Sequence, residues 1–350
     1  MGPIATAQYK AAIIGCGRIA SDFDDDPLMV KSYGISTHAG AYVDNPHIDL
    51  VAAADVSDDK LAKFGTRWGV GKLYKDYKEL LAKENIDILS ICTWNTTHLE
   101  ILEEAAKRKV KAIFCEKPLS NSLANADQMV KVARECGIPL FINHRRRWDD
   151  LYLKVRDYIK QGHLGQIQQV SCYYTSGVAN TCSHLFDTLR MLFGEVKTVC
   201  AWVKNDANTN DPDMDGYLIL ENGTTVTVQA LDARHYSLFE FDIYGTNGRL
   251  RIEDNGFKTT YWPLRDNVQI PGFKALFKDN SPIEFVPKAI MVNAAQNIVD
   301  CLSAKAKPAG SGEDGVKSLE IICAFHASVK NGNTPVHLPL QQRDISIVSK

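Results

Sequence analysis

The chain lacks the clustered ligands of a structural zinc site, because none of its nine cysteines belongs to a Cys-x-x-Cys pair. The cysteine count is odd, and several cysteines lie inside apolar runs. Both features favour buried free thiols in a reducing compartment over a disulfide framework. We therefore expect no metal site and no disulfide.

The chain also lacks any run near the roughly 20 apolar residues that span a bilayer. Its N-terminus shows no charged-then-apolar leader. The formal net charge of −2 gives no electrostatic reason to expect a nucleic-acid or membrane partner. We expect a cytoplasmic protein with neither kind of partner.

What the chain has is length and a change of pattern. Its 350 residues favour two domains. Up to residue 143, short apolar runs alternate with helical patterns, which is typical of a parallel sheet covered on both faces. After residue 143, strand-like runs follow one another with few helices between them, as in a one-faced antiparallel sheet.

A glycine motif of the form G-x-G-x-x-A follows the first apolar run, 9–14. Its first glycine allows a tight turn, and its second lets the backbone approach a pyrophosphate at a helix N-terminus. The alternative is a chance glycine pair in a loop. We expect five residues of the motif to bind a dinucleotide: Gly15, Cys16, Gly17, Arg18 and Ile19.

Asp55 ends the second apolar run, where an acidic residue can bind the ribose hydroxyls. It lies 38 residues after Gly17, whereas about 20 is usual, so we infer an insertion within 21–45. The alternative is that Asp55 caps the next helix. Because no arginine follows Asp55 directly to meet a 2′-phosphate, NAD is favoured over NADP.

Two further motifs carry a family resemblance. Glu116-Lys117-Pro118 follows the apolar run 112–115, and His184 and Asp187 form a later His-x-x-Asp. With the glycine motif, these residues resemble the Gfo/Idh/MocA oxidoreductases, which include inositol and sugar-nucleotide dehydrogenases. Other matches run the length of the chain: His38 to Tyr42 with Pro46, 93–98, 143–147, 244–250 and 311–315.

The resemblance implies an α/β fold with two domains. The first, 1–143, is a Rossmann domain with a parallel sheet. The second, 144–350, is a C-terminal α+β domain built on a large, mostly antiparallel open sheet, and we leave open whether its last segment packs back on the first domain. In this family that sheet often joins subunits, so we expect a homodimer or homotetramer.

The resemblance also implies cofactor contacts beyond the glycine motif and Asp55. The residues concerned are Thr93, Trp94, Asn95, His98, Glu116, Lys117 and Asn143. Trp94 stands where the family often has proline, and it either stacks on a ligand or fills a hollow. His98 has a structural loop role as its alternative.

Oxidising a secondary alcohol requires a base for the hydroxyl proton. His184 is our candidate, because an inferred helix begins next to it and the helix dipole disfavours the imidazolium. Asp187, one turn later, can hold the ring or favour its charged form. Lys117 can polarise the reacting oxygen or share the proton transfer. The alternatives are a capping or core role for His184 and a surface ion pair between Lys117 and Glu116.

The substrate is expected to meet Lys117, Arg147, Asn180, His184 and Asp187. Asn180 stands where many family members carry aspartate, four residues before the histidine. An amide orients a hydroxyl but takes no proton, so His184 must bear more of the acid–base work. Arg147 would suit a carboxylate or phosphate, with a solvated basic turn as the alternative.

These residues predict an NAD-dependent oxidoreductase acting on a secondary hydroxyl or ketone of a sugar, cyclitol or sugar nucleotide. Two alternatives remain open: a non-catalytic NAD-binding regulator and an NAD-dependent glycoside hydrolase of the same architecture. The acidic stretch 206–215 is predicted to be a solvated loop.

Overall fold

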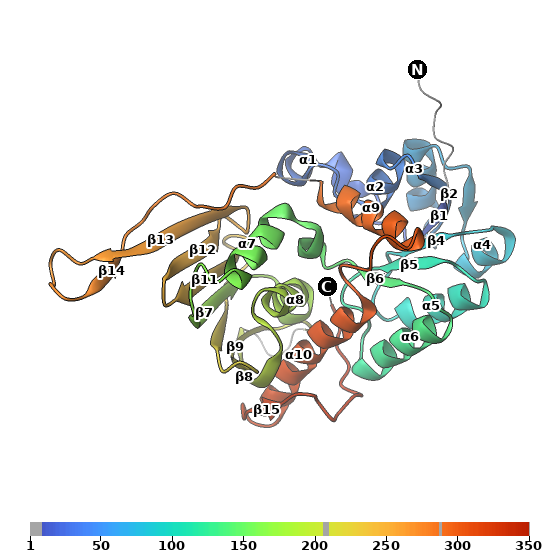
Figure 1. Cartoon of the computed structure of the whole chain (residues 1–350). Helices are drawn as coiled ribbons and strands as arrows, with labels where there is room; N and C mark the ends of the chain where they lie inside the picture. Colours follow the sequence, from blue (N-terminus) through green and yellow to red (C-terminus); the bar gives the residue numbers. More distant parts are fainter. Residues whose placement is uncertain (1–8, 206–209, 287–288, 350) are drawn as a thin grey trace, which may run out of the picture. The chain divides into compact units, whose positions relative to one another are not determined.

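The structure is a computed structural model that describes residues 9–205, 210–286 and 289–349 (Figure 1). The chain divides into two compact units. The first comprises the described residues of Met1–Asp149 and Lys288–Val316, and the second those of Asp150–Pro287 and Lys317–Lys350. Within the described ranges, no helix has both the length and the apolar character that a membrane span requires.

A six-stranded parallel sheet forms the centre of the first unit, in the order β3-β2-β1-β4-β5-β6. The strand order reverses between β1 and β4, the point at which such sheets bind ligands. All residues of β4 and β5 are buried, as expected for strands covered on both faces. The strands are β1 (Tyr9–Ile14), β2 (Ile48–Ala54), β3 (Lys72–Tyr74), β4 (Ile88–Ile91), β5 (Ala112–Cys115) and β6 (Leu140–Ile142).

Helices cover both faces of this sheet. α5 packs beside α6 on one face and α2 beside α9 on the other (Figure 1). Ser57 and Asp76 cap α3 and α4 through their side chains. The helices are α2 (His38–Asp44), α3 (Asp58–Trp68), α4 (Tyr77–Lys83), α5 (His98–Lys107), α6 (Leu123–Glu135) and α9 (Ile290–Leu302).

The helix expected directly after the glycine motif is interrupted, so that prediction was wrong. After one turn the chain leaves the helical path, forms the 3₁₀ turn Asp22–Asp25 and the short helix α1 (Pro27–Tyr33), and then returns. The N–H groups of His38 and Ala39 donate to the carbonyls of residues 19 and 20, at 3.2 and 3.0 Å. α2 therefore continues the interrupted turn, and residues 22–36 are looped out of it.

Asp24 holds this loop closed. Its carboxylate accepts the N–H and hydroxyl of Ser36, at 2.8 and 3.0 Å, and the hydroxyl of Thr37. Thr37 in turn caps α2 by accepting the N–H of Gly40 at 3.0 Å. The looped-out residues account for the long spacing between the glycine motif and Asp55.

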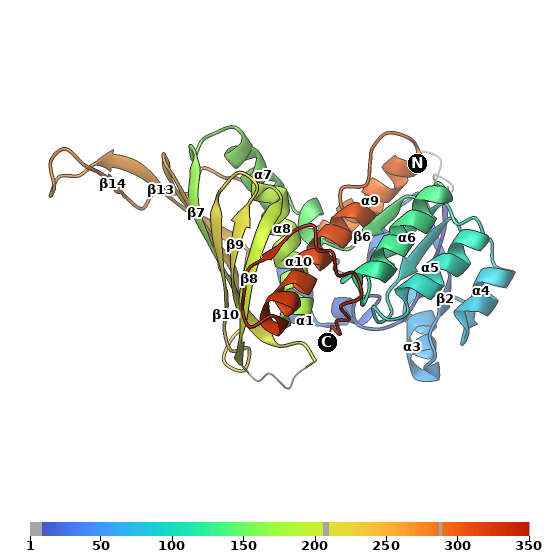
Figure 2. The ribbon, with the colours of Figure 1, turned by 90° about the horizontal axis from the view of Figure 1, so that it is seen from below.

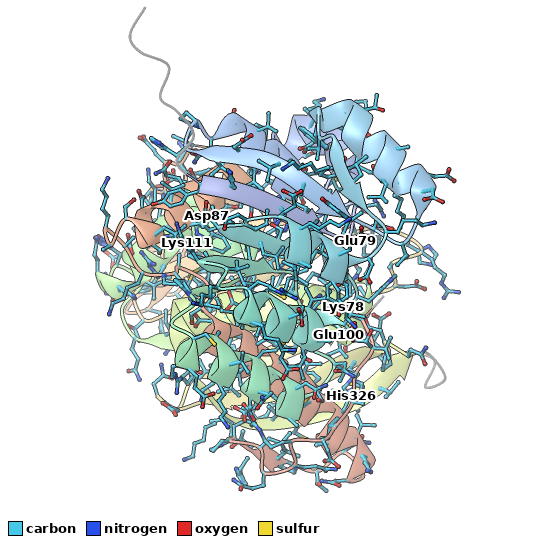
Figure 3. The ribbon with its side chains drawn as sticks, turned by 90° about the vertical axis from the view of Figure 1, so that its right-hand side faces the viewer. Lys78, Glu79, Asp87, Glu100, Lys111 and His326 are labelled. Atoms are coloured by element: carbon cyan, nitrogen blue, oxygen red, sulfur yellow. The ribbon has the colours of Figure 1, made fainter. Side chains whose placement is uncertain are left out.

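The amino edge of the sheet is tied together by Asp87 (Figure 3). Its carboxylate accepts the N–H of Lys10 in β1 at 2.8 Å and pairs with the ammonium of Lys111 at 2.8 Å. Lys111 directly precedes β5, so one side chain joins three strands. The predicted cofactor-binding residues follow the strands at the opposite, carboxyl edge.

A nine-stranded, mostly antiparallel sheet forms the second unit, in the order β14-β13-β12-β11-β7-β10-β9-β8-β15. β7 and β10 pair in parallel, and the other neighbours are antiparallel. This confirms the predicted fold class. The strands are β7 (Ile167–Tyr174), β8 (Val196–Asn205), β9 (Asp213–Leu220), β10 (Thr225–Ala230), β11 (Phe239–Gly245), β12 (Gly248–Glu253), β13 (Lys258–Asp266), β14 (Lys274–Leu276) and β15 (Val336–His337).

One face of this sheet is covered by helices. Burial alternates along β10 and β12, so each strand turns every second side chain toward the covered face. Figure 2 shows α7 (Asp150–Lys160), α8 (Cys182–Phe193) and α10 (Gly312–Lys330) on that face. Phe186 of α8 packs against Phe325 of α10, with ring centroids 5.0 Å apart. β13 and β14 extend beyond the neighbouring strands as a ribbon (Figure 1).

Candidate active site

The two glycines of the motif have different reasons to be glycine. Gly15 has a φ of +91°, and a Cβ there would lie 2.7 Å from the carbonyl of Cys92 after β4. A Cβ at Gly17 would meet nothing within 4 Å. Packing within the chain therefore explains Gly15 but not Gly17, and the open space over Gly17 fits a bound pyrophosphate.

Cys16 and Arg18 differ in exposure. The thiol of Cys16 is buried against the carbonyl of Ala54, and burial raises its pKa to about 12. Cys16 can therefore offer a ligand only its backbone. Arg18 is exposed, with its guanidinium 4.6 Å from the ring centroid of Phe23.

Asp55 ties the glycine turn to the end of β2. One carboxylate oxygen accepts the N–H of Cys16 at 2.7 Å, and the other accepts the N–H of Ser57 at 2.9 Å. Ser57, not Asp55, occupies the N-cap position of α3 and accepts the N–H of Lys60. The alternative in which Asp55 serves as the helix cap was wrong. Ribose binding by Asp55 remains a prediction.

A chain of buried hydrogen bonds reaches Glu116, which follows β5. Tyr42 Oη lies 2.7 Å from Ser90 Oγ, which lies 2.8 Å from His38 Nδ1. His38 Nε2 and Asn143 Nδ2 both reach Glu116 Oε1, at 3.0 and 2.6 Å. Asn143 Oδ1 is buried and has no hydrogen-bond partner among the described residues. No site role was predicted for His38, although the family signature of the first helix contains it.

The charge state of Glu116 determines which group donates in its hydrogen bond with His38. Burial opposes ionisation of Glu116, but the hydrogen bond and charge of His38, the Asn143 amide and the charge of Lys117 outweigh it, so the pKa of Glu116 is lowered. An ionised carboxylate only accepts, so His38 Nε2 donates the hydrogen that it shares with Glu116 Oε1. Glu116 also accepts the N–H of Lys117 at 3.2 Å, which fixes the backbone of this half-buried lysine.

The loop after β4 presents Trp94 to solvent. The N–H and hydroxyl of Thr97 both donate to the carbonyl of Trp94, at 3.0 and 2.9 Å, while the indole is 67% exposed. Trp94 therefore does not fill a hollow. The amide of Asn95 is buried and donates to the carbonyl of Ser120 at 3.3 Å.

His98 is buried at the start of α5. Its ring nitrogens lie 3.1 Å from the carbonyl of Thr93 and 3.0 Å from that of Leu119. Burial lowers the pKa of His98, because a desolvated imidazolium is disfavoured. These contacts join the loop after β4 to the segment after Lys117 and favour the structural alternative for His98.

In the second unit, Asn180, His184 and Asp187 share one helical segment. The π-helical turn Gly177–Thr181 leads directly into α8, so His184 lies beyond the first turn of the helical path. The predicted dipole effect on His184 is therefore weaker than expected, because it fades within one turn. His184 and Asn180 are half-buried, whereas Asp187 is buried with its carboxylate 3.7 Å from Arg190.

Two other predictions need correction. Arg147 is mostly buried, and its guanidinium donates to the carbonyl of Ala309 at 3.0 Å and to Asp314 at 2.8 Å. The solvated-turn alternative was wrong, and these contacts favour an anchoring role over substrate binding. The stretch 206–215 is not simply solvated: residues 206–209 lie outside the described residues, but Asp211 is 7% exposed and β9 begins at Asp213.

The structure thus gathers the predicted residues in two groups. The glycine turn, Asp55, the loop 93–98, Lys117 and Asn143 follow strands at the carboxyl edge of the first sheet. Asn180, His184 and Asp187 lie on the segment leading through α8 of the second unit. In the part of the chain that the structure describes, no group of histidine, cysteine or acidic residues could hold a metal ion.

The fold and the glycine turn define a two-domain dinucleotide-binding protein. Residues 9–144 match the oxidoreductase family model of the NAD-binding Rossmann fold, and residues 156–338 match the C-terminal alpha/beta domain of the same family. The chain therefore belongs to the Gfo/Idh/MocA family of oxidoreductases. It is accordingly an NAD(P)-dependent dehydrogenase of a family that acts on sugar hydroxyls.

Similar proteins include sugar and cyclitol dehydrogenases. The chain is 37% identical over 334 residues to myo-inositol 2-dehydrogenase of Thermotoga maritima, covering 89% of this chain and 93% of that protein. It is 26% identical over 353 residues to D-apiose dehydrogenase of Paraburkholderia graminis, covering 93% and 89%. A levoglucosan dehydrogenase solved with NADH and L-sorbose shares the fold, with a TM-score of 0.79, 17% identity and coverage of 95% and 100%.

Proposed function

We propose that this protein is an NAD-dependent dehydrogenase that oxidises a secondary hydroxyl of a sugar, cyclitol or sugar nucleotide, or reduces the matching ketone. The observation that carries the proposal is the buried chain from Tyr42 to Glu116, which fixes the backbone of Lys117 at the same carboxyl edge of the sheet as the glycine turn. The relatives named for inositol and D-apiose oxidation support the substrate class.

The chemistry divides between cofactor and side chains. The glycine turn and Asp55 would hold NAD, which would supply a hydride acceptor for the carbinol carbon. We assign His184 as the base that takes the hydroxyl proton, and Lys117 as the cation that stabilises the developing alkoxide. Asn180 and Asp187 lie within one turn of His184, where Asn180 can orient a neighbouring hydroxyl. Arg147 is left out of the substrate site because its guanidinium is already engaged.

The preference for NAD over NADP is part of the same proposal. Asp55 is followed by Val56, an apolar side chain that is 85% exposed. A carboxylate at the end of β2 accepts hydroxyls of an unmodified ribose but repels a 2′-phosphate. We expect the dissociation constant for NADP to exceed that for NAD by at least about tenfold, which is about 1.4 kcal/mol.

A substrate panel tests the proposed activity. The wild-type chain is incubated with NAD or NADP and with inositols, free sugars, anhydrosugars and sugar nucleotides, and reduced nicotinamide is followed by absorbance. We expect reduction of NAD by at least one of these alcohols. Release of free sugar from a glycoside without net reduction would instead identify a glycoside hydrolase, and tight NAD binding with no turnover on any compound would identify a regulator.

We further propose a cytoplasmic homodimer or homotetramer joined through the second sheet. The face of this sheet away from α7, α8 and α10 carries cross-strand ion pairs, such as Arg249 with Asp242 and Arg251 with Glu240, both at 2.6 Å. Light scattering of the purified chain measures the mass directly. A monomer at micromolar concentration would contradict this part of the proposal.

A further inference from the structure

Asp211 lies against the turn that leads into α8. One oxygen of its buried carboxylate accepts the N–H of Ala179 at 2.7 Å, and the other accepts the N–H of Asn180 at 3.0 Å. Thr181, at the N-cap position of α8, makes no side-chain capping hydrogen bond to the helix. Asp211 therefore satisfies N–H groups that a helix start otherwise leaves without partners, although it comes from a distant part of the chain.

The two segments fit closely. Gly177 donates its N–H to Asp213 at 2.9 Å, and Val178 donates to the carbonyl of Pro212 at 3.1 Å. Four consecutive N–H groups, those of residues 177–180, are thus bound by residues 211–213. Gly177 has a φ of +84°, and a Cβ there would lie 2.3 Å from a carboxylate oxygen of Asp211. The glycine therefore makes room for this carboxylate.

The contact between residues 211–213 and the turn 177–180 fixes the backbone next to Asn180 and His184, the residues proposed to act on the substrate. The carbonyl of Asn180 accepts the hydroxyl of Ser183 at 2.8 Å, so the backbone of Asn180 is held on both sides. His184 follows one turn later, and its carbonyl accepts the hydroxyl of Thr188 at 2.7 Å.

We propose that Asp211 is a positioning residue for the dehydrogenase reaction: it fixes the turn 177–180 and thereby aims Asn180 and His184. The proposal rests on the proposed function, in which His184 is the base. A misplacement of about 1 Å in a reacting group can cost about 100-fold in rate. We therefore expect Asp211→Ala to lower kcat about 100-fold while the dissociation constant for NAD changes less than about twofold, because the glycine turn and Asp55 belong to the other unit.

A conservative variant and a matched control separate positioning from general damage. Asp211→Asn keeps one oxygen that can accept an N–H, so we expect it to recover about tenfold of the lost rate. Asp215→Asn removes the same charge a few residues further along. The Asp215 carboxylate accepts the N–H of Ala230 at 2.7 Å and lies 3.6 Å from Lys204, and neither residue belongs to the turn. We expect its kcat to stay within about twofold of wild type.

Two measurements on the full chain loaded with NAD test whether Asp211 positions Asn180 and His184. One is kcat and KM for the best alcohol of the panel; the other is hydrogen exchange resolved to the amides of residues 177–184. Faster exchange at Ala179 and Asn180, with a fall in kcat, in Asp211→Ala but not in Asp215→Asn is the expected result. Unchanged exchange, an unchanged kcat, or an equal loss in Asp215→Asn would overturn the proposal. If the wild type oxidises no alcohol, the proposed function fails while hydrogen exchange still reports whether Asp211 holds the turn.

Discussion

At the scale of single residues, Trp94 offers the clearest test of the cofactor site. It follows β4 at the point where the strand order reverses, and its backbone is fixed while its indole is exposed. We predict that the indole stacks on the nicotinamide ring. A ring stacked on the positively charged oxidised nicotinamide contributes about 1–2 kcal/mol, so Trp94→Ala should weaken NAD binding about tenfold and NADH binding less.

Calorimetric titration of the wild type, Trp94→Ala and Trp94→Phe with each cofactor form checks this prediction. The phenylalanine variant is the matched control, because it keeps a smaller aromatic face and should lie between the other two. Equal affinities in all three proteins would show that Trp94 does not touch the cofactor. An unchanged NAD affinity with a raised KM for the alcohol would place the indole on the substrate.

Glu116 predicts a dependence of stability on pH. Its folded pKa lies below the ordinary value of 4.5, so ionisation stabilises the folded chain above that pH. This contribution is lost as the pH falls through the folded pKa. Glu116→Gln should therefore cost about 1–3 kcal/mol at pH 7, and the gap to wild type should shrink in acid.

Urea unfolding at a series of pH values measures that gap. Glu79→Gln is a control, because Glu79 forms an exposed i,i+4 ion pair with Lys83 that contributes at most about 1 kcal/mol. A gap for Glu116→Gln that stays constant from neutral pH down to acid pH would show that the carboxylate is not held ionised by its neighbours.

At the scale of elements, the looped-out segment 22–36 makes a structural prediction. The N–H groups of His38 and Ala39 in α2 already donate to carbonyls of the turn that ends at Ala20, so joining Ser21 directly to Thr37 should give one continuous helix. We expect the shortened chain to fold and to bind NAD within about threefold of wild type, since loops of this kind are tolerated with small changes in free energy. Calorimetry and circular dichroism check both points, and loss of NAD binding in a folded variant would refute this interpretation.

The elements also show which features of the fold could be predicted from the sequence. The apolar runs 9–14 and 112–115 coincide with β1 and β5, because a short apolar run of strand length can be recognised without tertiary information. The path of 22–36 could not be predicted, because it depends on a carboxylate at Asp24 meeting Ser36 and Thr37 in space. The site shows the same division: Glu-Lys-Pro is readable as a motif, whereas the contact of His38 with Glu116 joins residues 78 positions apart.

At the scale of the whole molecule, the first unit is discontinuous in sequence. α9, from the last quarter of the chain, buries six apolar side chains in its core: Ile290, Met291, Ala294, Ala295, Ile298 and Val299. The four larger ones contribute roughly 6–12 kcal/mol of burial, which is comparable to the total stability of a domain. We predict that the fragment 1–149 alone lacks cooperative unfolding and does not bind NAD.

The matched control protein carries residues 289–316 joined to the same fragment through a flexible linker, which should restore both properties. Thermal unfolding and NAD titration of the two proteins give the comparison. A fragment 1–149 that unfolds cooperatively and binds NAD as the full chain does would show that α9 is not part of the folding unit.

The central claim is that Lys117 and His184 perform the proton and charge chemistry of a dehydrogenase, and kcat for the best alcohol tests it most directly. We predict that Lys117→Ala and His184→Ala each lower kcat about 100- to 10,000-fold with NAD binding retained. Lys111→Ala, at the opposite edge of the sheet (Figure 3), and His163→Ala, an exposed histidine, should turn over like the wild type. Wild-type kcat in both Lys117→Ala and His184→Ala would contradict the account.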